Sequence, residues 1–254
     1  MTTSGGTPTS SSGSRGFCSP ARGAWRALEG WIALLFPPHC ILCGGALDGL
    51  DVVCPTCAGS LPELPGPRCR RCGEALPNPG VDLCLRCGTQ PRAVDRFYSL
   101  GPYDGPWGEL VRALKFDREV AVGRFLSGRM DDWACEHAVT DAFDLITYVP
   151  MRPADRRERG FNQAELLARG VAGRLRRPVR RTLMKVRATV AQGQLSARER
   201  RMNLRGAFRP VRYGQERVLL VDDIATTGST MEECASALKR GGYRSVVVLT
   251  IARA

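Results

Sequence analysis

Two adjacent carboxylates, Asp222 and Asp223, lie in the part of this sequence with the clearest chemical pattern. They follow a short apolar run, residues 218–221, with β-branched residues at both ends, which is typical of a strand buried on both faces of a parallel sheet. A small turn rich in hydroxyl groups comes next, and residues 231–240 then read as a helix that stops at Gly241. We therefore expect the carboxylates at the carboxyl end of a strand, where open α/β sheets bind ligands.

The turn after the two acids has the composition of a phosphate cradle. Free N–H groups at a helix start and the helix dipole both favour an anion, and hydroxyl groups add further donors. We expect the cradle to consist of Ala225, Thr226, Thr227, Gly228, Ser229 and Thr230. Because carboxylates repel phosphate, the acids should contact another part of the ligand, either vicinal sugar hydroxyls or a Mg²⁺ ion between acids and phosphates. A ribose 5-phosphate unit fits both halves of such a site.

Residues 218–230 resemble the phosphoribosyl pyrophosphate (PRPP) signature of type I phosphoribosyltransferases, which is an apolar strand, two acids and a Thr/Gly/Ser loop. Two other interpretations stay open. The apolar run and acids also resemble the first strand of a response-regulator receiver, although only 31 residues follow Asp223, too few for the rest of that domain. An ordinary acidic turn after a buried strand is the simplest alternative.

Cysteines indicate a metal-binding module. The chain has eleven, and eight form four C-x-x-C pairs: Cys40 and Cys43, Cys54 and Cys57, Cys69 and Cys72, Cys84 and Cys87. This spacing without a secretory signal predicts two tetrahedral Cys₄ zinc sites rather than disulfides. The near-equal loops favour sequential pairing, with a cross-braced arrangement as the alternative. We expect His39 to be a bystander, and Cys135 and Cys234 to pack in the core.

Positive charge is concentrated in one segment. The chain has a net charge of +12, whereas residues 152–212 alone carry +14, so the remainder sums to −2. A basic block of this size could bind polyphosphate, nucleic acid or both. The alternative is a solvated, arginine-rich surface that reflects the composition of the genome.

Strand and helix patterns alternate from residue 94 onward. We expect strands at residues 94–103, 144–149, 179–186, 218–224 and 245–251, and helices at residues 107–116, 119–136 and 161–175. Residues 155–160 read as a charged loop and residues 187–207 as a long mobile loop. The alternation predicts an α/β fold with a doubly wound, mainly parallel sheet.

The N-terminal part has a different character. We expect a disordered tail at residues 1–23, rich in Thr, Ser and Gly, and an amphipathic helix at residues 24–38 that packs on the protein itself. The remaining domains are expected at residues 39–90, a double zinc ribbon, and at residues 91–254. No stretch of eighteen apolar residues is present, so we expect no transmembrane segment, and the start does not read as a signal peptide.

Several further motifs narrow the resemblance to one family. They are Arg159-Gly160-Phe161-Asn162-Gln163, Arg187-x-Thr189-x-x-Gln192-x-x-Leu195, Arg200-x-x-Asn203, Gly206-Ala207-Phe208 and Leu114-Lys115-Phe116. Together with the cysteine pairs, they make residues 34–254 resemble the ComF family. The resemblance implies a double zinc ribbon joined to a type I phosphoribosyltransferase domain. It also implies a role with single-stranded DNA in natural transformation, proteins of the DNA-uptake machinery as partners, and a location in the cytoplasm or at the inner face of the membrane.

Site roles follow from the resemblance. Asp222 and Asp223 would hold the ribose hydroxyls of PRPP, and residues 226–230 its 5-phosphate. Pro150, Met151 and Arg152 lie where these folds have their pyrophosphate loop. Residues 187–205 lie where these enzymes carry a flexible lid.

The chemistry of a transferase would follow from charge. Displacing pyrophosphate from C1 develops positive charge on the ribose ring and negative charge on the leaving group. Mg²⁺ and three arginines, Arg152, Arg187 and Arg200, are candidates to stabilise the leaving group, and Asp223 could face the ring cation.

No stretch of the sequence is assignable to recognition of an acceptor, so more than one function stays open. In the first interpretation, the chain is a phosphoribosyltransferase with an unidentified acceptor. It would then act either in DNA handling or in nucleotide metabolism without a DNA role. Alternatively, it is a non-catalytic PRPP sensor that binds single-stranded DNA, with Phe161, Tyr148 or Tyr213 as stacking platforms.

Overall fold

A sheet of four parallel strands is the centre of this computed structural model, which describes residues 38–47, 49, 51–116, 120–187, 202 and 204–254. The helices and strands are α2 Pro55–Gly59, α3 Leu85–Thr89, β1 Arg96–Pro102, α4 Pro106–Phe116, α5 Val120–Glu136, η1 Thr140–Ala142, β2 Leu145–Tyr148, α6 Pro153–Arg159, α7 Gln163–Leu175, β3 Leu183–Lys185, β4 Phe208–Pro210, β5 Arg217–Ala225, α9 Ser229–Arg240 and β6 Ser245–Arg253.

The strand order of the sheet is β1-β6-β5-β2, which places β5 inside the sheet and β1 and β2 at its edges. Both neighbours of β5 run parallel to it, with Leu145 opposite Val218 on one side and Asp222 opposite Thr250 on the other. Residues 218–221 are completely buried because helices cover both faces. Since all four strands run in one direction, their carboxyl ends meet at one edge of the sheet.

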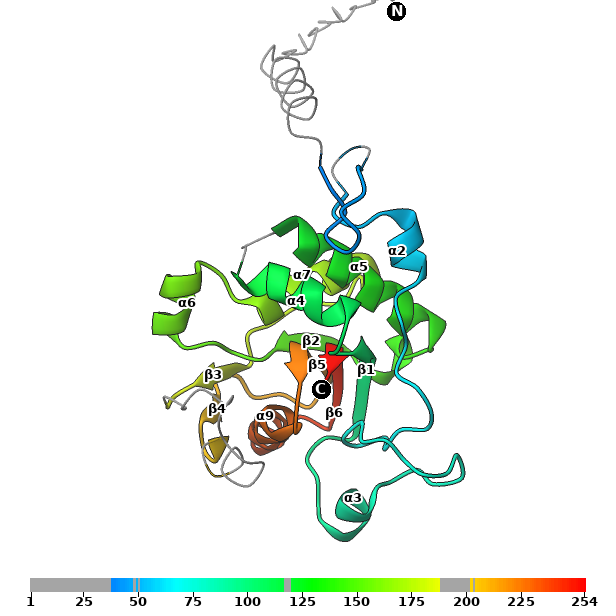
Figure 1. The fold of residues 1–254 in the computed structure, drawn as a ribbon. Coiled ribbons are helices and arrows are strands. Elements are labelled where there is room, and N and C mark those ends of the chain that lie inside the picture. Colours follow the sequence, from blue (N-terminus) through cyan, green and yellow to red (C-terminus); the bar gives the residue numbers. More distant parts are fainter. Residues whose placement is uncertain (1–37, 48, 50, 117–119, 188–201, 203) are drawn as a thin grey trace, which may run out of the picture.

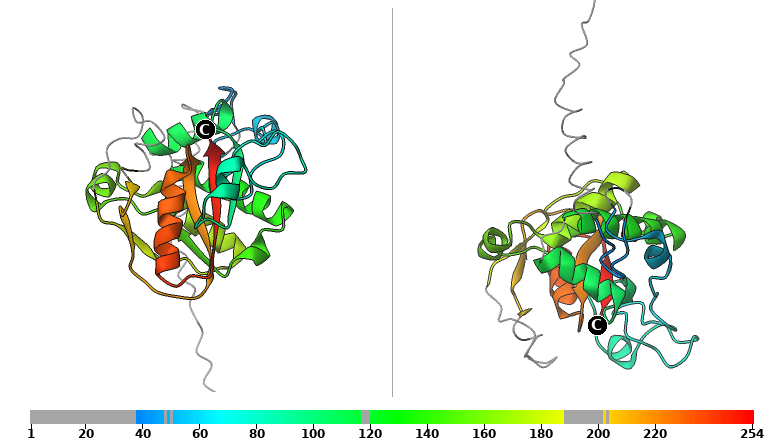
Figure 2. Two further views of the ribbon diagram at one scale, coloured as in Figure 1. Left: turned by 90° about the horizontal axis from the view of Figure 1, so that it is seen from below. Right: turned by 45° about the horizontal axis from the view of Figure 1, so that its top comes forward.

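Two layers enclose the sheet (Figure 1). Helices α4, α5 and α7 cover one face, and α9 covers the other together with the antiparallel pair β3-β4. The view from below shows α9 lying across β5 and β6, and the tilted view shows the other three helices over the opposite face (Figure 2). Each face has its own buried apolar cluster, so the sheet is a doubly covered α/β core.

The cysteine-rich segment forms two small units that contact the core at different places. The first unit packs its Cys40, Leu47 and Val53 against the cluster beneath α4 and α5. The second unit has a small cluster of its own and lies beside β1, where the N–H of Phe97 donates to the carbonyl of Arg70 at 2.7 Å. A tight contact fixes the segment between them, since Trp107 Nε1 donates to the Pro62 carbonyl at 2.7 Å.

The expected fold class is confirmed: the chain is an α/β protein with a parallel sheet preceded by two cysteine clusters. The helices expected from residues 107, 119 and 161 begin within two residues of α4, α5 and α7. The domain boundaries remain predictions, and the tail and amphipathic helix at residues 1–38 lie almost entirely outside the described residues. No helix among the described residues is long and apolar enough to cross a membrane.

The charged loop expected at residues 155–160 is wrong, because helix α6 spans most of that segment. Pro153 occupies the first turn of α6, where its missing N–H group does no harm. Asp155 lies in the first turn and Arg156, Arg157 and Arg159 in the last, so the charges complement the helix dipole. A helix of seven residues is too short to show an apolar period.

Two other local expectations are also wrong in detail. The strand expected at residues 179–186 is regular only in β3, and Val179 makes a single bridge to Ile146. Its partner β4 begins directly after the segment expected to be a long loop, residues 187–207, of which residues 188–201 and 203 are outside the described part. Cys135 is exposed rather than buried because it follows Ala134, the last buried position of α5. Cys234 is buried, as expected.

Candidate active site and metal centres

Asp222 and Asp223 lie near the carboxyl end of β5, and both side chains line the same two cavities there. Asp223 is buried, and its Oδ2 lies 2.8 Å from Nζ of Lys115 in the last turn of α4. Asp223 Oδ1 also accepts the N–H of Ile224 at 2.8 Å. Two adjacent acids are thus held beside one ammonium group.

Burial raises the pKa of Asp222 well above its ordinary value of 3.8, and the negative charge of Asp223 acts in the same direction. Lys115 opposes this shift. Ionisation of Asp222 is therefore less favourable than that of an exposed carboxyl, and a cation or hydroxyl donors beside it would favour the ionised form.

The loop after the acids has the geometry of an anion cradle. Gly228 caps α9 with φ at +71°, in the left-handed region that favours glycine. The hydroxyls of Thr227 and Ser229 lie 2.8 Å apart, and the Ser229 N–H donates to Thr227 Oγ1 at 3.4 Å. The first N–H groups of α9 have no partner within the helix, as at every helix start, so the loop offers donors to a ligand.

Two cavities meet at the acid pair. One, of about 250 Å³, lies along the loop and is lined by residues 222–226, 228–231 and Lys115. The other, of about 240 Å³, lies at the end of β2 and is lined by Val149, Pro150, Met151, Asp155, Arg159, Asn162, Gln163, Ala164, Lys185 and the same three charged residues, Lys115, Asp222 and Asp223. Their shared wall is the acid pair with its lysine. The arrangement gives one elongated site with a loop end and a β2 end.

The arginines expected at the site are placed differently from one another. Arg152 follows Pro150 and Met151 but turns to Asp155, with Nε and Nη2 donating at 3.0 and 2.6 Å. Arg187 is exposed and donates to the carbonyl of Arg205 at 3.0 Å. Arg200 lies outside the described residues. Of the two described arginines, neither lines the cavities at the acid pair.

Two lysines at the site were not assigned a role from the sequence. Lys115 contacts Asp223, and Lys185 lines the β2 end, where burial lowers its pKa and Asp155 opposes the shift. The rarity of lysine in the sequence is a signal that points to these two residues. The chain has only three lysines beside thirty-four arginines, and two of the three lie here.

Both cysteine clusters have the geometry of a Cys₄ metal site. The Sγ atoms of Cys40, Cys43, Cys54 and Cys57 lie within 4.8 Å of one another, and so do those of Cys69, Cys72, Cys84 and Cys87. The pairing is therefore sequential, and the cross-braced alternative is wrong. Backbone amides point at the sulfurs, as when Cys54 N–H donates to Cys40 Sγ at 3.3 Å. The residues fit structural zinc.

In each cluster the amides favour the thiolate form of one cysteine, while neighbouring thiols and burial raise the pKa of Cys57, Cys72 and Cys87. Burial alone would raise the pKa of Cys40, yet N–H donors from Cys54, Cys43 and Leu42 lower it to about 6. In the second cluster, N–H donors from Cys84, Arg71 and Cys72 outweigh burial and lower the pKa of Cys69 to about 7. His39 is exposed and not among the residues that converge in either cluster.

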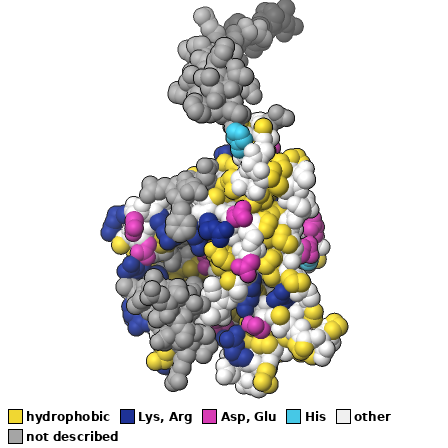
Figure 3. All heavy atoms as spheres, in the orientation of Figure 1, with side chains coloured by type: hydrophobic (Ala, Val, Ile, Leu, Met, Phe, Trp, Pro, Cys, Tyr) yellow, Lys and Arg dark blue, Asp and Glu magenta, His cyan; other side chains and the backbone are white. Residues whose placement is uncertain are grey.

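Aromatic residues considered as stacking platforms are mostly inaccessible. Tyr148 is buried under α7 and Phe161 is half-buried, whereas Tyr213 is 78% exposed. Basic side chains gather on the side of the molecule that carries α6 (Figure 3). In the basic segment at residues 152–212, the exposed residues Arg157, Arg176 and Arg181 make no ion pair with any residue that the structure describes.

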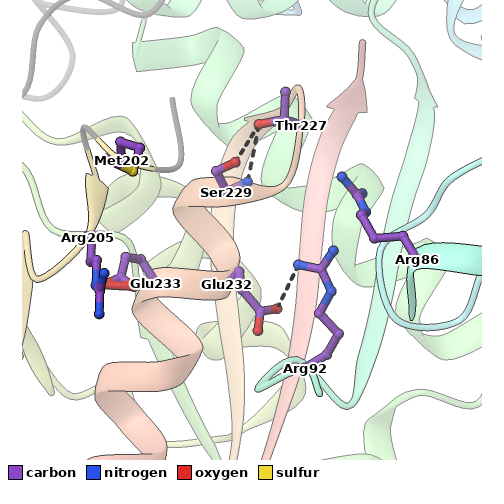
Figure 4. Close-up of a pocket in the computed structure, with 8 residues that line it drawn as sticks. All are labelled: Arg86, Arg92, Met202, Arg205, Thr227, Ser229, Glu232 and Glu233. Carbon is purple, nitrogen blue, oxygen red and sulfur yellow. Dashed lines mark hydrogen bonds and ion pairs between the residues drawn. The ribbon is translucent and has the colours of Figure 1, made fainter. Parts of the chain in front are cut away.

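The second cysteine cluster borders the cradle from the other side. Figure 4 shows Arg86 of α3 across β6 from Thr227 and Ser229, with the ion pair between Arg92 and Glu232 below. These residues line a cavity of about 470 Å³ together with Met202, Arg205 and Glu233. The metal module and the cradle therefore share a boundary.

A parallel α/β sheet with a PRPP-type loop at its carboxyl edge, preceded by two Cys₄ clusters, defines a phosphoribosyltransferase-like protein with a double zinc ribbon. A family model described as a double zinc ribbon domain matches residues 31–90. DNA utilization protein YhgH of Salmonella typhimurium is 34% identical over 208 residues, covering 79% of this chain and 90% of that protein. Competence protein F of Haemophilus influenzae is 31% identical over 225 residues, covering 85% and 97%. The chain belongs to the family of these proteins, the ComF family.

Two solved structures match about half of this chain. The structure of the allosteric regulatory enzyme of purine biosynthesis is 27% identical with a TM-score of 0.35, covering 50% of this chain and 25% of that one. Glutamine PRPP amidotransferase from B. subtilis, complexed with ADP and GMP, has the same identity and TM-score, with 50% and 26% covered. The chain spans about a quarter of the length of these two proteins.

The raised pKa of Asp222 predicts that its charge destabilises the fold at neutral pH. Well below pH 4 the carboxyl is protonated in both the folded and the unfolded chain, so it does not destabilise the fold. As pH rises above about 4 the unfolded chain ionises first, and the destabilisation grows until pH passes the higher folded pKa. We expect Asp222→Asn to raise the melting temperature at pH 7 by about 2–4 °C, or about 1 kcal/mol, with the gain shrinking toward pH 4.

The control has the opposite sign. Arg217 holds the pKa of Asp144 at about 2, so Asp144 stabilises the fold above its ordinary pKa of 3.8. Asp144→Asn should lower the melting temperature at pH 7. Calorimetric scans of both variants between pH 4 and 8 check the pair, and a loss of stability in Asp222→Asn at pH 7 would contradict the prediction.

The two clusters predict two zinc ions per chain, bound independently. Cys43→Ser should lose one equivalent and retain the other, while Cys135→Ser, which removes an exposed cysteine outside both clusters, should retain two. Each site should contribute on the order of 10 kcal/mol of apparent binding free energy at pH 7. Metal analysis of the purified full chain measures the stoichiometry. Loss of both ions in Cys43→Ser would show that the clusters are not independent.

Proposed function

We propose that this protein binds PRPP together with Mg²⁺ at the carboxyl edge of the sheet. The observation that supports the proposal is the pair of cavities that share Lys115, Asp222 and Asp223 as a common wall. A ligand with phosphate at both ends and a ribose in the middle matches this arrangement. The ribose hydroxyls would donate to the acids while the phosphates occupy the two ends.

The loop end fits the 5-phosphate. N–H groups of the first turn of α9 and the hydroxyls of Thr226, Thr227, Ser229 and Thr230 supply the donors, and the helix dipole adds a partial positive charge. The nearby acids would oppose a phosphate, but the ammonium of Lys115, 2.8 Å from Asp223, offsets one negative charge. The acids can then face the sugar rather than the phosphate.

The β2 end fits the pyrophosphate. Lys185 and Arg159 contribute positive charge, and Pro150 and Met151 contribute backbone to the wall. Arg152 would reach the ligand only by leaving Asp155. Mg²⁺, held by the acid pair and by ligand oxygens, would supply charge neutralisation for the pyrophosphate. In a transferase reaction, Asp223 and Asp222 would face the positive charge that develops on the ribose ring.

We further propose that the site serves the handling of single-stranded DNA, because the relatives of this chain are named DNA utilization protein and competence protein. Exposed arginines of the segment at residues 152–212 would contact the DNA phosphates, with Tyr213 as the accessible stacking residue. Reduced Cys₄ clusters suit a cytoplasmic location, at the inner face of the membrane if proteins of the DNA-uptake machinery are partners. This proposal includes two alternatives. Either the protein transfers the phosphoribosyl group of PRPP to an acceptor, or it senses PRPP without catalysis.

The PRPP site predicts calorimetric binding in the micromolar range for wild type with Mg²⁺. The variant with both Asp222→Asn and Asp223→Asn should bind at least about 100-fold more weakly, since hydrogen bonds to charged groups contribute about 1.5–3 kcal/mol each. Asp144→Asn, which removes an exposed carboxylate far along β2 from the loop, is the matched control and should bind like wild type. Tight binding of PRPP by the double variant would contradict the assignment of Asp222 and Asp223 to the PRPP site.

The DNA role predicts strong salt dependence. Affinity for a single-stranded oligonucleotide should fall steeply between about 50 and 200 mM salt, because bound counterions are released. Replacing Arg157, Arg176 and Arg181 together by Gln should make the slope of log K against log salt shallower by about 2, at about 0.7 per lost phosphate contact. The Asp222 and Asp223 double variant should bind DNA as well as wild type. A flat salt response in wild type would count against a DNA role.

A further inference from the structure

Arg253, near the end of β6, has a buried side chain that connects two parts of the molecule far apart in sequence. Its Nη1 donates to the carbonyl of Thr226, the first residue after β5, at 2.6 Å. Its Nε donates to the carbonyl of Gly73 at 3.2 Å, and its Nη2 to Glu74 Oε2 at 3.3 Å. One guanidinium therefore bonds the phosphate loop on one side and the second zinc ribbon on the other.

The ribbon side of this bridge is the turn made by a metal-ligand pair. Gly73 and Glu74 directly follow Cys72, and the turn is closed by the Cys69 N–H donating to Glu74 O and the Gly73 N–H donating to Cys69 O, both at 2.8 Å. Gly73 has φ at +70°, and a Cβ there would collide with the ring of Phe97. Only a glycine lets the turn pack this close to Phe97, whose ring also lies against the guanidinium of Arg253, so the contact depends on the shape of the turn that holds the metal.

The loop side of the bridge sets the direction of a donor. In a trans peptide the carbonyl of one residue and the N–H of the next point in opposite directions within one plane. Because Arg253 holds the Thr226 carbonyl, the N–H of Thr227 must point away from Arg253. The Ala254 N–H donates to the Ala225 carbonyl at 3.0 Å, which fixes the preceding peptide as well.

The guanidinium itself is well held. Its fork geometry satisfies three acceptors in one plane, as arginine but not lysine can do. The ring of Phe97 lies under it, with 5.5 Å between the guanidinium carbon and the ring centroid. Burial lowers the pKa of Arg253, and the charge of Glu74 acts against that shift. A buried charge with this many partners is expensive to move, so it acts as a rigid strut.

We propose that Arg253 is a positioning residue through which the second zinc ribbon fixes the phosphate loop. The turn at Cys69–Cys72 orients Arg253, and Arg253 orients the peptide between Thr226 and Thr227. The inference rests on the proposed function only in that the loop is taken to bind the 5-phosphate. The ribbon is then part of the support of the ligand site rather than a separate module.

The first test measures loop order without any ligand. NMR relaxation of the full, zinc-loaded chain should give backbone order parameters near about 0.85 for Thr227 and Gly228 in wild type, and below about 0.6 in Arg253→Met. Arg68→Met is the matched control. Arg68 and Arg253 both line a cavity of about 720 Å³ beside the second ribbon. Among the described residues, Arg68 makes no hydrogen bond to the loop. Its substitution should leave both amides rigid. Unchanged order parameters in Arg253→Met would overturn the proposal.

A second variant covers the case in which Arg253→Met loses zinc or fails to fold. Glu74→Gln removes only the charge on the exposed ribbon-side partner and leaves the buried guanidinium in place. We expect a smaller fall in order at Thr227 than in Arg253→Met, with both zinc ions retained. Identical order to wild type would mean that the ribbon does not act through Arg253.

The final arm separates this inference from the proposed function. PRPP with Mg²⁺ should bind Arg253→Met at least about tenfold more weakly than wild type, and Arg68→Met within about twofold, because only the former misorients loop donors worth about 1.5 kcal/mol or more. If wild type binds no PRPP while loop order still depends on Arg253, the ligand assignment is wrong and the strut stands. If PRPP binds equally to all three proteins, the strut has no role in the site.

Discussion

Two carboxylates side by side at the carboxyl end of β5, with a single ammonium 2.8 Å from one of them, are the constraint on which the rest of this structure depends. Burial raises the pKa of Asp222, and repulsion from the charge of Asp223 adds to this shift. Such an arrangement persists only if the surrounding structure holds it. Here the strand is internal and fully buried before the acids, and α4 brings Lys115 over the edge of the sheet. The fold stabilises a site that is unfavourable without a ligand.

The zinc ribbons also need a source of stability other than a large apolar core. Each ribbon has few apolar residues, so a metal must replace the core that it lacks. The first ribbon adds its Leu47 and Val53 to the apolar layer beneath α4 and α5. The second instead makes polar contacts with the carboxyl edge of the sheet through Gly73 and Glu74. The two ribbons resemble each other in sequence but are joined to the core by different kinds of contact.

Local signals in the sequence predicted much of the site, and contacts between distant residues supplied the rest. The apolar run, the acids and the loop are contiguous, so the strand, the helix start and the cradle could be predicted together. Spacing favoured the sequential cysteine pairing but left a cross-braced arrangement open, and the positions of the sulfurs decide between them. Lys115 meets an acid more than a hundred residues away, and Arg253 meets a turn 180 residues away, so no local pattern shows either contact. Helix α6 was missed because its seven residues, five of them charged, have no apolar period to detect.

The choice between lysine and arginine at the site has a physical reason. Arginine stays charged under all ordinary conditions and bonds in a fixed fork, which suits Arg253 as a permanent strut. Lysine carries a compact charge on a flexible stem, and burial can shift its pKa, as it does for Lys185. If the acid pair binds a metal or a sugar as proposed, an ammonium that can move aside is more useful beside it than a rigid guanidinium. On that proposal, Lys115 and Lys185, two of three lysines in a chain with thirty-four arginines, are the groups expected to respond when the ligand binds.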